Sequence, residues 1–259
     1  MIPTPPPHGR LSYDFRKAVR LLLLTSLHLS GCVALEFDRM TGTTFPPQHM
    51  VNGQPVTLES IYDDAGISLE VEEDETTIVP LNIANNDCIS DAELDALENG
   101  HRHLSLFPSS ACGLAICNTY HLYGVVVDHY GEVLDACIPE FVLGKMWQSH
   151  TRSAFAIFYA MNTLQTDGPA YLRTTAHEAG HGFNLHHSDG DGTSIMTQTD
   201  DLTGDPVYAF SPQSNEHLDT HPAPCKFPGA VGGAPFTWVS NAHAAWLHPS
   251  EDLTVSDCE

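Results

Sequence analysis

Lysine and arginine are scarce in this sequence. The 259 residues include 10 lysines and arginines against 33 aspartates and glutamates, which gives a formal net charge of −23 at pH 7. A surface this acidic repels phosphate groups, so the composition argues against nucleic-acid binding and against adhesion to anionic lipid by charge. It could attract cationic partners, but the simpler interpretation is that the charge keeps the protein soluble.

Long hydrophobic runs are also missing. The apolar stretch at 21–29 is too short to span a bilayer, which takes about 20 residues. It follows a basic region at 16–20 and ends in Leu29-Ser30-Gly31-Cys32, which is similar to a bacterial lipobox. We therefore predict that residues 1–31 are a signal peptide, that the protein is exported, and that Cys32 is lipidated and anchors it to a bacterial membrane. Cleavage of an ordinary signal peptide, giving a secreted protein, is the alternative.

No CxxC pair is present, which argues against a cysteine-based metal site. An exported chain with an even number of cysteines is typically stabilised by disulfides. We predict up to three disulfides, with Cys112–Cys117 and Cys225–Cys258 as the favoured pairs, although the spacing alone does not determine the pairing. The cysteines that follow Cys32 are Cys88, Cys112, Cys117, Cys137, Cys225 and Cys258.

Internal repeats and long low-complexity linkers are absent as well, so the part after residue 31 is predicted to form one domain. Residues 32–53 contain Pro46-Pro47 and Asn52-Gly53 and predict an irregular lead-in. Residues 54–259 then make up the domain with its C-terminal tail, and we expect a monomer.

The first part of this domain predicts a helix and a strand. Apolar residues recur at helical spacing over 58–65 and stop at Gly66, a residue type that commonly follows a helix end. Apolar and polar residues then alternate over 67–71, as in a half-buried strand. The acidic stretch at 72–75 is expected to be a solvated loop.

Two further helices have marked starts. Ser90 and Glu93 form a capping box for a short helix through Glu98, which Asn99-Gly100 is expected to end. A later helix is predicted to begin at Ser211-Pro212 and to run to about residue 219, with His221-Pro222 after its end.

Between them, three apolar segments predict strands at 122–127, 141–147 and 154–161. The last is almost wholly apolar, as expected for a central strand covered on both faces. A long helix follows, opened by Asp167-Gly168-Pro169 with the proline in its first turn. One side of this helix is apolar through Leu172, Ala176, Ala179 and Phe183.

The segment His177-Glu178-Ala179-Gly180-His181 lies within this helix. Side chains four residues apart lie on one face of a helix, so both imidazoles can reach one metal ion. Glu178 stands beside the first histidine, where its carboxylate can take a proton from water held by the metal. Because such a segment also occurs by chance in buried helices, its meaning depends on the residues that follow.

A third histidine, His187, comes six residues after His181. It cannot reach the same ion from a straight continuation of the helix, so the chain must turn, and Asn184 is the predicted pivot because asparagine tolerates a left-handed conformation. Three neutral imidazoles and one open position are typical of a catalytic zinc site rather than a structural one. From geometry alone, the adjacent His186 is an alternative third ligand.

Together with Ser194-Ile195-Met196, these residues resemble the metzincin clan of zinc endopeptidases, whose pattern is HExxHxxGxxH followed by a methionine-containing turn. The spacing is nearest to the matrixin branch. The resemblance implies that zinc is the cofactor, that Glu178 is the general base, and that Met196 lies in the turn below the metal without binding it. The implied zinc ligands are His177, His181 and His187.

Two positions depart from the family pattern. Asn184 stands where the family has glycine, a change that a left-handed turn tolerates. Gln198 stands where some members carry a tyrosine that binds the metal, so no tyrosine ligand is expected here.

The resemblance also implies the fold and the reaction. The expected fold class is α+β: a zincin-like metzincin domain with a mixed twisted sheet, a long active-site helix and a small C-terminal subdomain. The implied reaction is hydrolysis of a peptide bond in a protein or peptide substrate by a metal-activated water. We expect the extended substrate to pair with an exposed sheet edge, and residues 140–147 are the candidate edge.

Two nearby features have simpler interpretations. Asp189-Gly190-Asp191-Gly192 could bind calcium through hard oxygen ligands, but it lacks a recognisable calcium-loop pattern, and a turn leading to Met196 is favoured. His101 and His103 have no ligand spacing and are expected to be surface or hydrogen-bonded residues.

Two other functional classes stay open. A catalytically idle, zinc-containing surface lipoprotein could use the same ligands for structure while binding a partner, although a structural site has no use for Glu178. A zinc hydrolase that acts on non-peptide amides is a weaker third possibility.

Overall fold

The computed structural model describes residues 32–78, 88–103, 119–131, 142–148, 152–220 and 228, all of which belong to one compact unit, Gly31–Glu259. Several predictions lie outside these residues: the signal peptide at 1–31, the end of the last helix at 221–222, and most of the cysteines. Cys88 is fully buried and is the only cysteine whose side chain lies within the described part, so the disulfide pairing stays a prediction.

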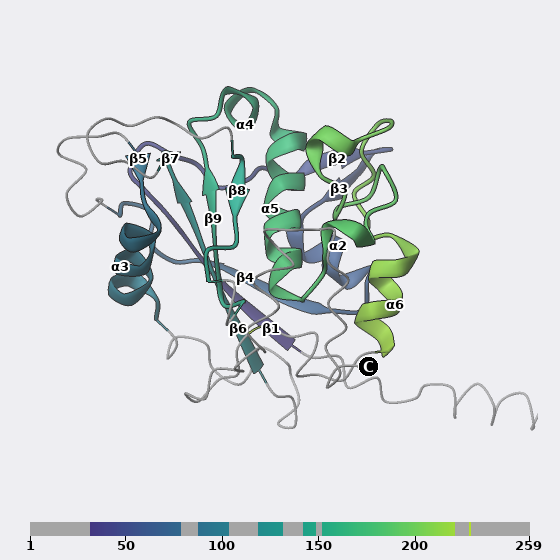
Figure 1. The fold of residues 1–259 in the computed structure, drawn as a ribbon, viewed down its shortest axis with the longest axis horizontal. Coiled ribbons are helices and arrows are strands. Elements are labelled where there is room, and N and C mark those ends of the chain that lie inside the picture. The colour runs from purple at the N-terminus through teal and green to yellow at the C-terminus, as the bar shows by residue number, and fades with distance from the viewer. Residues whose placement is uncertain are drawn as a thin grey trace, which may run out of the picture. The chain divides into compact units, whose positions relative to one another are not determined.

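The described residues build a five-stranded sheet in the order β4-β1-β6-β9-β8 (Figure 1). Neighbouring strands run parallel except at one edge, where β8 pairs antiparallel with β9. A mostly parallel sheet with helices packed on it is consistent with the predicted α+β class. The strands are β1 (Cys32–Arg39), β4 (Ser68–Glu73), β6 (Thr119–Val127), β8 (Gly144–Lys145) and β9 (Ala154–Phe158).

The prediction of an irregular lead-in at 32–53 was wrong, because its first eight residues form β1. This strand lies inside the sheet, paired with β4 on one side and β6 on the other. Both of its faces are buried, so it lacks the alternating pattern of a half-exposed strand. Glu36 and Asp38, buried on the face opposite Leu35 and Phe37, also break the apolar run that would have marked it.

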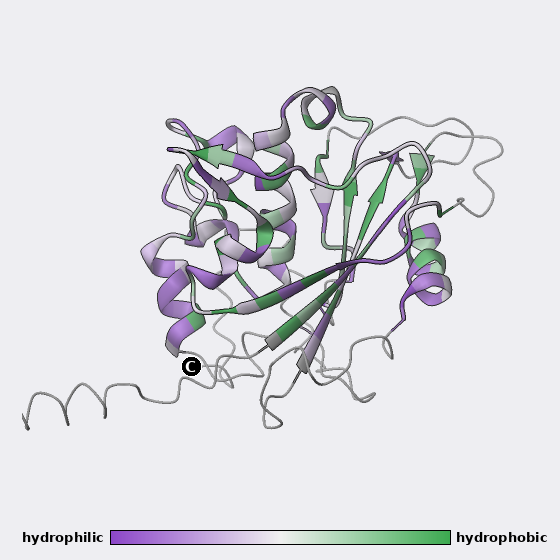
Figure 2. Cartoon of the chain, turned by 180° about the vertical axis from the view of Figure 1, so that it is seen from behind, coloured by the Kyte–Doolittle hydropathy of each residue, from purple (hydrophilic) through white to green (hydrophobic). Residues whose placement is uncertain are grey.

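Helices cover both faces of the sheet (Figure 1). On one face, α2 (Leu58–Asp63) and α5 (Gly168–Gly182) enclose the larger core. On the other face, α3 (Asp91–His101) buries Leu94 and Leu97 against β6 and β9. Figure 2 shows hydrophobic residues gathered along the strands between these layers. No helix of the described residues is long and apolar enough to cross a membrane.

The remaining elements are short. α4 (Asn162–Thr166) leads into α5. α6 (Pro212–Thr220) follows the segment that contains His187 and Met196. Two small sheets complete the described structure: β2 (His49–Val51) with β3 (Gln54–Val56), and β5 (Cys88–Ile89) with β7 (His129–Tyr130).

The predicted helix starts are confirmed. α3 begins with the capping box, in which Ser90 accepts from the Glu93 backbone and Glu93 accepts from the Ser90 backbone. α6 begins at Pro212, with the Ser211 hydroxyl accepting from the backbone N–H of Ser214 at 3.0 Å. Gly66 follows α2 with a φ of +76°, the left-handed conformation that glycine adopts without strain.

Several predicted ends were wrong. α3 continues through Asn99-Gly100 to His101, because the backbone N–H of Arg102 still donates to Glu98 and the two side chains form an ion pair at 2.5 Å. β4 runs on to Glu73, into the predicted acidic loop. The predicted strand at 141–147 shortens to β8, β6 begins at Thr119, and β9 ends at Phe158.

His101 and His103 are hydrogen-bonded, as expected. His101 Nδ1 lies 2.8 Å from Glu75, and His103 Nδ1 lies 3.1 Å from Asp74. The backbone N–H of His103 also donates to the buried carboxylate of Glu36, whose pKa burial raises to about 7. These groups stabilise one another at the end of β1, on the sheet face that α3 covers.

Candidate metal centre

α5 is a helix buried along most of its length. Asp167 caps it by accepting from the backbone N–H of Ala170 at 3.0 Å, and Pro169 lies in its first turn, as predicted. Every residue from Tyr171 to Gly182 is buried, including the apolar side at Leu172, Ala176 and Ala179. Tyr62 of α2 donates to the carbonyl of Ala176 at 2.8 Å, which fixes the helix against its neighbour.

His177 and His181 extend from this helix with their rings edge to face, 4.7 Å apart between centroids. Each ring is oriented by a backbone carbonyl: His177 Nδ1 lies 2.8 Å from the oxygen of Ile195, and His181 Nδ1 lies 2.8 Å from the oxygen of Leu185. A carbonyl can only accept, so both Nδ1 atoms carry the proton and both Nε2 atoms are left as metal ligands.

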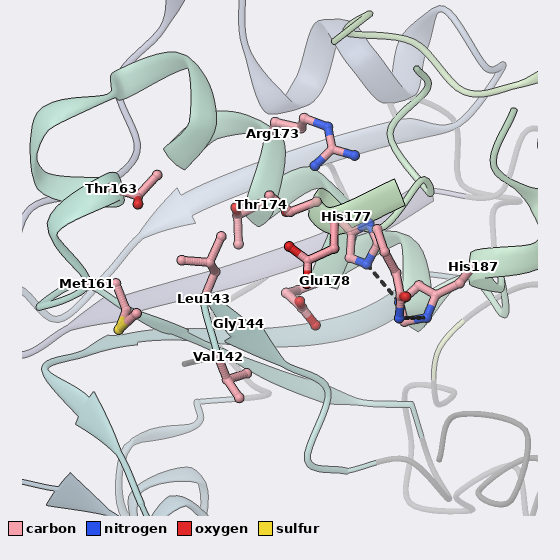
Figure 3. A pocket seen from close by; sticks show the side chains of 13 residues that line it. Val142, Leu143, Gly144, Met161, Thr163, Arg173, Thr174, His177, Glu178 and His187 are labelled. Atoms are coloured by element: carbon pink, nitrogen blue, oxygen red, sulfur yellow. Dashed lines mark hydrogen bonds between the residues drawn. The ribbon is translucent and has the colours of Figure 1, made fainter. Parts of the chain in front are cut away.

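The chain turns where predicted. Asn184 has a φ of +61°, in the left-handed region, and the backbone N–H of Leu185 returns to the carbonyl of Gly180 at 3.2 Å. This turn ends α5 and brings His187 back over it. His187 Nε2 lies 3.0 Å from His177 Nε2 (Figure 3) and 3.2 Å from His181 Nε2, which the figure does not draw.

His186 is not part of this group. Its backbone N–H donates to the side chain of Asp189 at 2.7 Å, at the start of the short 3-10 helix His187–Asp189. Among the described residues, the three histidines that could hold one ion together are His177, His181 and His187. His187, rather than His186, is therefore the histidine that lies with His177 and His181.

The three imidazoles are held in the neutral form that binds metals. Burial and the neighbouring rings lower the pKa of His177 to about 3 and that of His187 to about 4, and they hold the pKa of His181 well below its usual range. Three unprotonated nitrogens this close repel one another unless a cation lies between them. The donor set therefore fits a divalent metal with nitrogen ligands, such as zinc.

Gln198 contacts the third histidine. Its side-chain amide lies 2.6 Å from His187 Nδ1, and with the amide oxygen turned to the ring it accepts the Nδ1 proton. All three rings then have an outer partner, as metal-binding histidines usually do. Gln198, which stands where some metzincins carry a tyrosine, thus contacts a histidine of the cluster through its side-chain amide.

Met196 packs directly under α5. It is fully buried, and a Cβ atom on Gly180 would lie only 2.6 Å from its sulfur, so a larger residue at this point would displace the methionine side chain. The turn that contains Met196 also supplies the Ile195 carbonyl that orients His177. Met196 and the histidines are therefore parts of one packed unit.

The segment 189–192 is a turn, and calcium binding there has no support in the structure. The Asp191 side chain accepts from the backbone N–H groups of Thr193 and Ser194, at 3.1 and 2.9 Å. Gly190 passes so close to Thr197 that a Cβ would lie 2.7 Å from its backbone. These contacts shape the approach to Met196, as the favoured interpretation predicted.

Glu178 lies beside the histidines in a cavity of about 460 Å³. It is buried, with a hydrogen bond to the backbone of Met146, and burial raises its pKa to about 8. The cavity opens between α5 and the segment around β8, and Figure 3 shows Glu178 close to His177 on its wall. The lining residues are Val142, Leu143, Gly144, Met161, Thr163, Arg173, Thr174, His177, Glu178, His187, Gln198, Thr199 and Asp200.

Two lining residues were not identified from the sequence. Gly144 in β8 approaches Glu178, and only the packing of β8 against α5 reveals this. Arg173 lines the cavity one helical turn before His177, and its spacing of four residues was a signal that could have placed it on the same helix face.

Comparisons with known proteins add little to this site. No protein-family model matches the chain, and no curated protein matches it by sequence. Among solved structures, the chain is similar to a zinc-dependent peptidase from Methanocorpusculum labreanum (strain Z), with 15% sequence identity and a TM-score of 0.37 over 72% of this chain and 99% of that one. A similarity this weak assigns neither a family nor an activity.

Proposed function

We propose that this protein is a zinc-dependent endopeptidase of the metzincin type, nearest to the matrixin branch. The observation that carries the proposal is the convergence of three neutral Nε2 atoms beside a buried carboxylate on the wall of an open cavity. A purely structural zinc site is closed by a fourth protein ligand, whereas this group offers three.

Glu178 is the general base of the proposed reaction. Zinc held by the three histidines would polarise the scissile carbonyl and make a water molecule acidic enough to attack it. Glu178 accepts the proton of that water and then delivers it to the leaving amine. Its position suits this role, because a buried carboxylate on the same cavity wall as His177 and His187 can carry the proton between the two steps.

The substrate is proposed to bind along β8. This strand is the edge of the described sheet, it runs antiparallel to β9, and Leu143 and Gly144 line the cavity next to Glu178. An extended peptide that pairs with this edge would pass in front of the histidines, with main-chain hydrogen bonds holding it straight. Val142, Leu143 and Gly144, from the candidate edge at 140–147, line the cavity, which supports this proposal.

Gly144 provides a test of this arrangement. In Gly144→Ala the new Cβ would lie 2.5 Å from Glu178 Cγ and 2.9 Å from Cδ, so the carboxylate must move. We expect kcat for peptide cleavage to fall by about 10- to 100-fold while bound zinc is unchanged, because a displacement of about 1 Å can cost this much. Gly100→Ala is the control, since a Cβ there meets nothing within 4 Å. Unchanged kcat in Gly144→Ala would contradict the placement of Glu178.

Removal of the metal tests the proposal as a whole. The purified protein is expected to contain about one zinc per chain, to cleave a mixed peptide library, and to lose that activity with a zinc chelator and regain it when zinc is added. Metal analysis and mass spectrometry of the library measure both results. Bound zinc without cleavage of any peptide would favour the idle surface lipoprotein instead, and cleavage of non-peptide amides alone would favour the third alternative.

We also propose that the protein is exported and anchored through a lipid on Cys32. The support is the lipobox-like Leu29-Ser30-Gly31-Cys32 after a short apolar stretch. β1 begins at Cys32, so cleavage before this residue leaves the sheet intact.

A further inference from the structure

Arg173 is a buried cation in the wall of the cavity. It lies one turn before His177 on α5 and is 4% exposed. It lines the same cavity as His177, Glu178 and His187 (Figure 3). The proposed reaction needs no positive side chain here, so its presence calls for another explanation.

Part of the guanidinium group holds the turn around Met196. Arg173 Nη2 donates to the carbonyl oxygens of Ser194, at 3.3 Å, and Thr197. Its Nε is buried and has no hydrogen-bond partner among the described residues. The turn therefore uses only a part of the five donors that an arginine offers.

Within the described part of the chain, no carboxylate pairs with the positive charge of Arg173. None of the ion pairs formed within the described residues includes it. Among the residues that the structure describes, the carboxylates that line the cavity are Glu178 and Asp200, and Asp200 is exposed and forms no ion pair with Arg173. A buried, unpaired guanidinium is costly, and an anionic ligand that enters the cavity would remove that cost.

We propose that this cavity selects a substrate carboxylate next to the scissile bond, with Arg173 as its partner. The carboxylate can belong to an aspartate or glutamate side chain or to the free carboxyl terminus of a short peptide. Arginine suits either, because its planar fork can donate two parallel hydrogen bonds to one carboxylate. The neighbouring Thr163 and Thr174, which also line the cavity, add hydroxyl groups to this polar surface.

The negative charge of the protein surface does not prevent a carboxylate from binding inside the cavity. The net charge of −23 repels an acidic peptide at a distance, but salt screens exposed charges beyond about 8 Å at physiological ionic strength. A contact inside the cavity is screened far less. Acidic substrates are therefore expected to bind more slowly at low salt and still to be preferred once they are bound.

This inference rests on the proposed function, because it assumes that the bound peptide is cleaved. Its test includes a binding measurement that needs no cleavage. Three alanine-based peptides are compared: one with glutamate next to the cleaved bond and an amidated terminus, its glutamine twin, and a shorter peptide with a free terminus at that position. Cleavage by the zinc-loaded wild type gives kcat/KM for each. Binding to zinc-loaded Glu178→Gln, measured by fluorescence anisotropy, gives the same comparison without any catalysis.

We expect the glutamate peptide or the free-terminus peptide to be favoured over the glutamine peptide by at least about tenfold, as for other charge-assisted hydrogen bonds. A favoured glutamate peptide identifies a side-chain carboxylate. A favoured free-terminus peptide identifies the carboxyl terminus and makes the reaction that of a carboxypeptidase rather than an endopeptidase. Arg173→Gln, which keeps a donor for the turn but loses the charge, should bring this ratio to within about twofold at unchanged zinc content. Arg173→Lys should retain part of the preference, and Arg102→Gln, at the end of α3 on the opposite face of the sheet, should retain all of it.

Equal treatment of all three peptides by wild type would overturn the inference, and this result does not depend on any variant folding. A preference that survives in Arg173→Gln would also overturn it, since Arg173 would then only hold the turn. If wild type cleaves none of the peptides but zinc-loaded protein still binds the carboxylate peptides more tightly, the endopeptidase proposal fails and the inference about the cavity stands.

Discussion

Glu178→Gln is expected to lower kcat/KM for peptide cleavage by about 10²- to 10⁴-fold while the protein keeps its zinc. Glutamine has nearly the same shape, so it fits between α5 and Gly144 without moving either. It cannot take a proton from water, and the proposed reaction stops at its first step. Rates on a peptide library and the zinc content of the same samples measure the two results.

Glu70→Gln is the matched control, because Glu70 is an exposed residue of β4, at the opposite edge of the sheet from β8. It should leave both rate and zinc unchanged. Full activity in Glu178→Gln would remove the assigned base. A loss of zinc in the same variant would show instead that Glu178 supports the metal site.

His187→Ala and His186→Ala form a second test, with opposite expected results. Loss of His187 removes one of three converging nitrogens, and zinc affinity should fall by more than about 100-fold, because even outer partners of metal ligands are worth 10- to 100-fold. Peptide cleavage should be lost with it. His186→Ala should keep the zinc and most of the activity, since His186 is not part of the group.

Competition with a fluorescent zinc chelator measures both affinities directly. If His186→Ala lost zinc and His187→Ala did not, the third ligand would be wrongly assigned. If both variants lost zinc affinity equally and still unfolded cooperatively on heating, zinc binding would depend on the conformation of the bend after Asn184 more than on either imidazole.

The parts of the site that depend on neighbours in the sequence could be predicted. The cap at Asp167, the left-handed residue Asn184 and the spacing of the histidines are each set within one or two turns of helix. The choice of His187 over His186 needed the family pattern, because both rings can follow the same bend.

The parts that depend on packing between distant segments could not be predicted. β1 pairs with strands far along the chain on both sides, and its buried Glu36 and Asp38 hide it from a search for apolar runs. Gly144 and Glu178 meet only because β8 packs against α5. Signal cleavage, lipidation of Cys32 and the pairing of the cysteines depend on residues or side chains outside the described part of the chain, and they stay predictions.

The position of β1 restricts how the proposed protease could be kept inactive by a segment that precedes it. A protease is often restrained by an N-terminal propeptide that is cut away at activation, but a cut within β1, between Cys32 and Arg39, would shorten or remove a strand that is paired on both sides. Such a cut would damage an inner strand of the sheet instead of releasing a segment that blocks the site. If the proposed protease is activated by trimming from this side, the cut must therefore fall before β1.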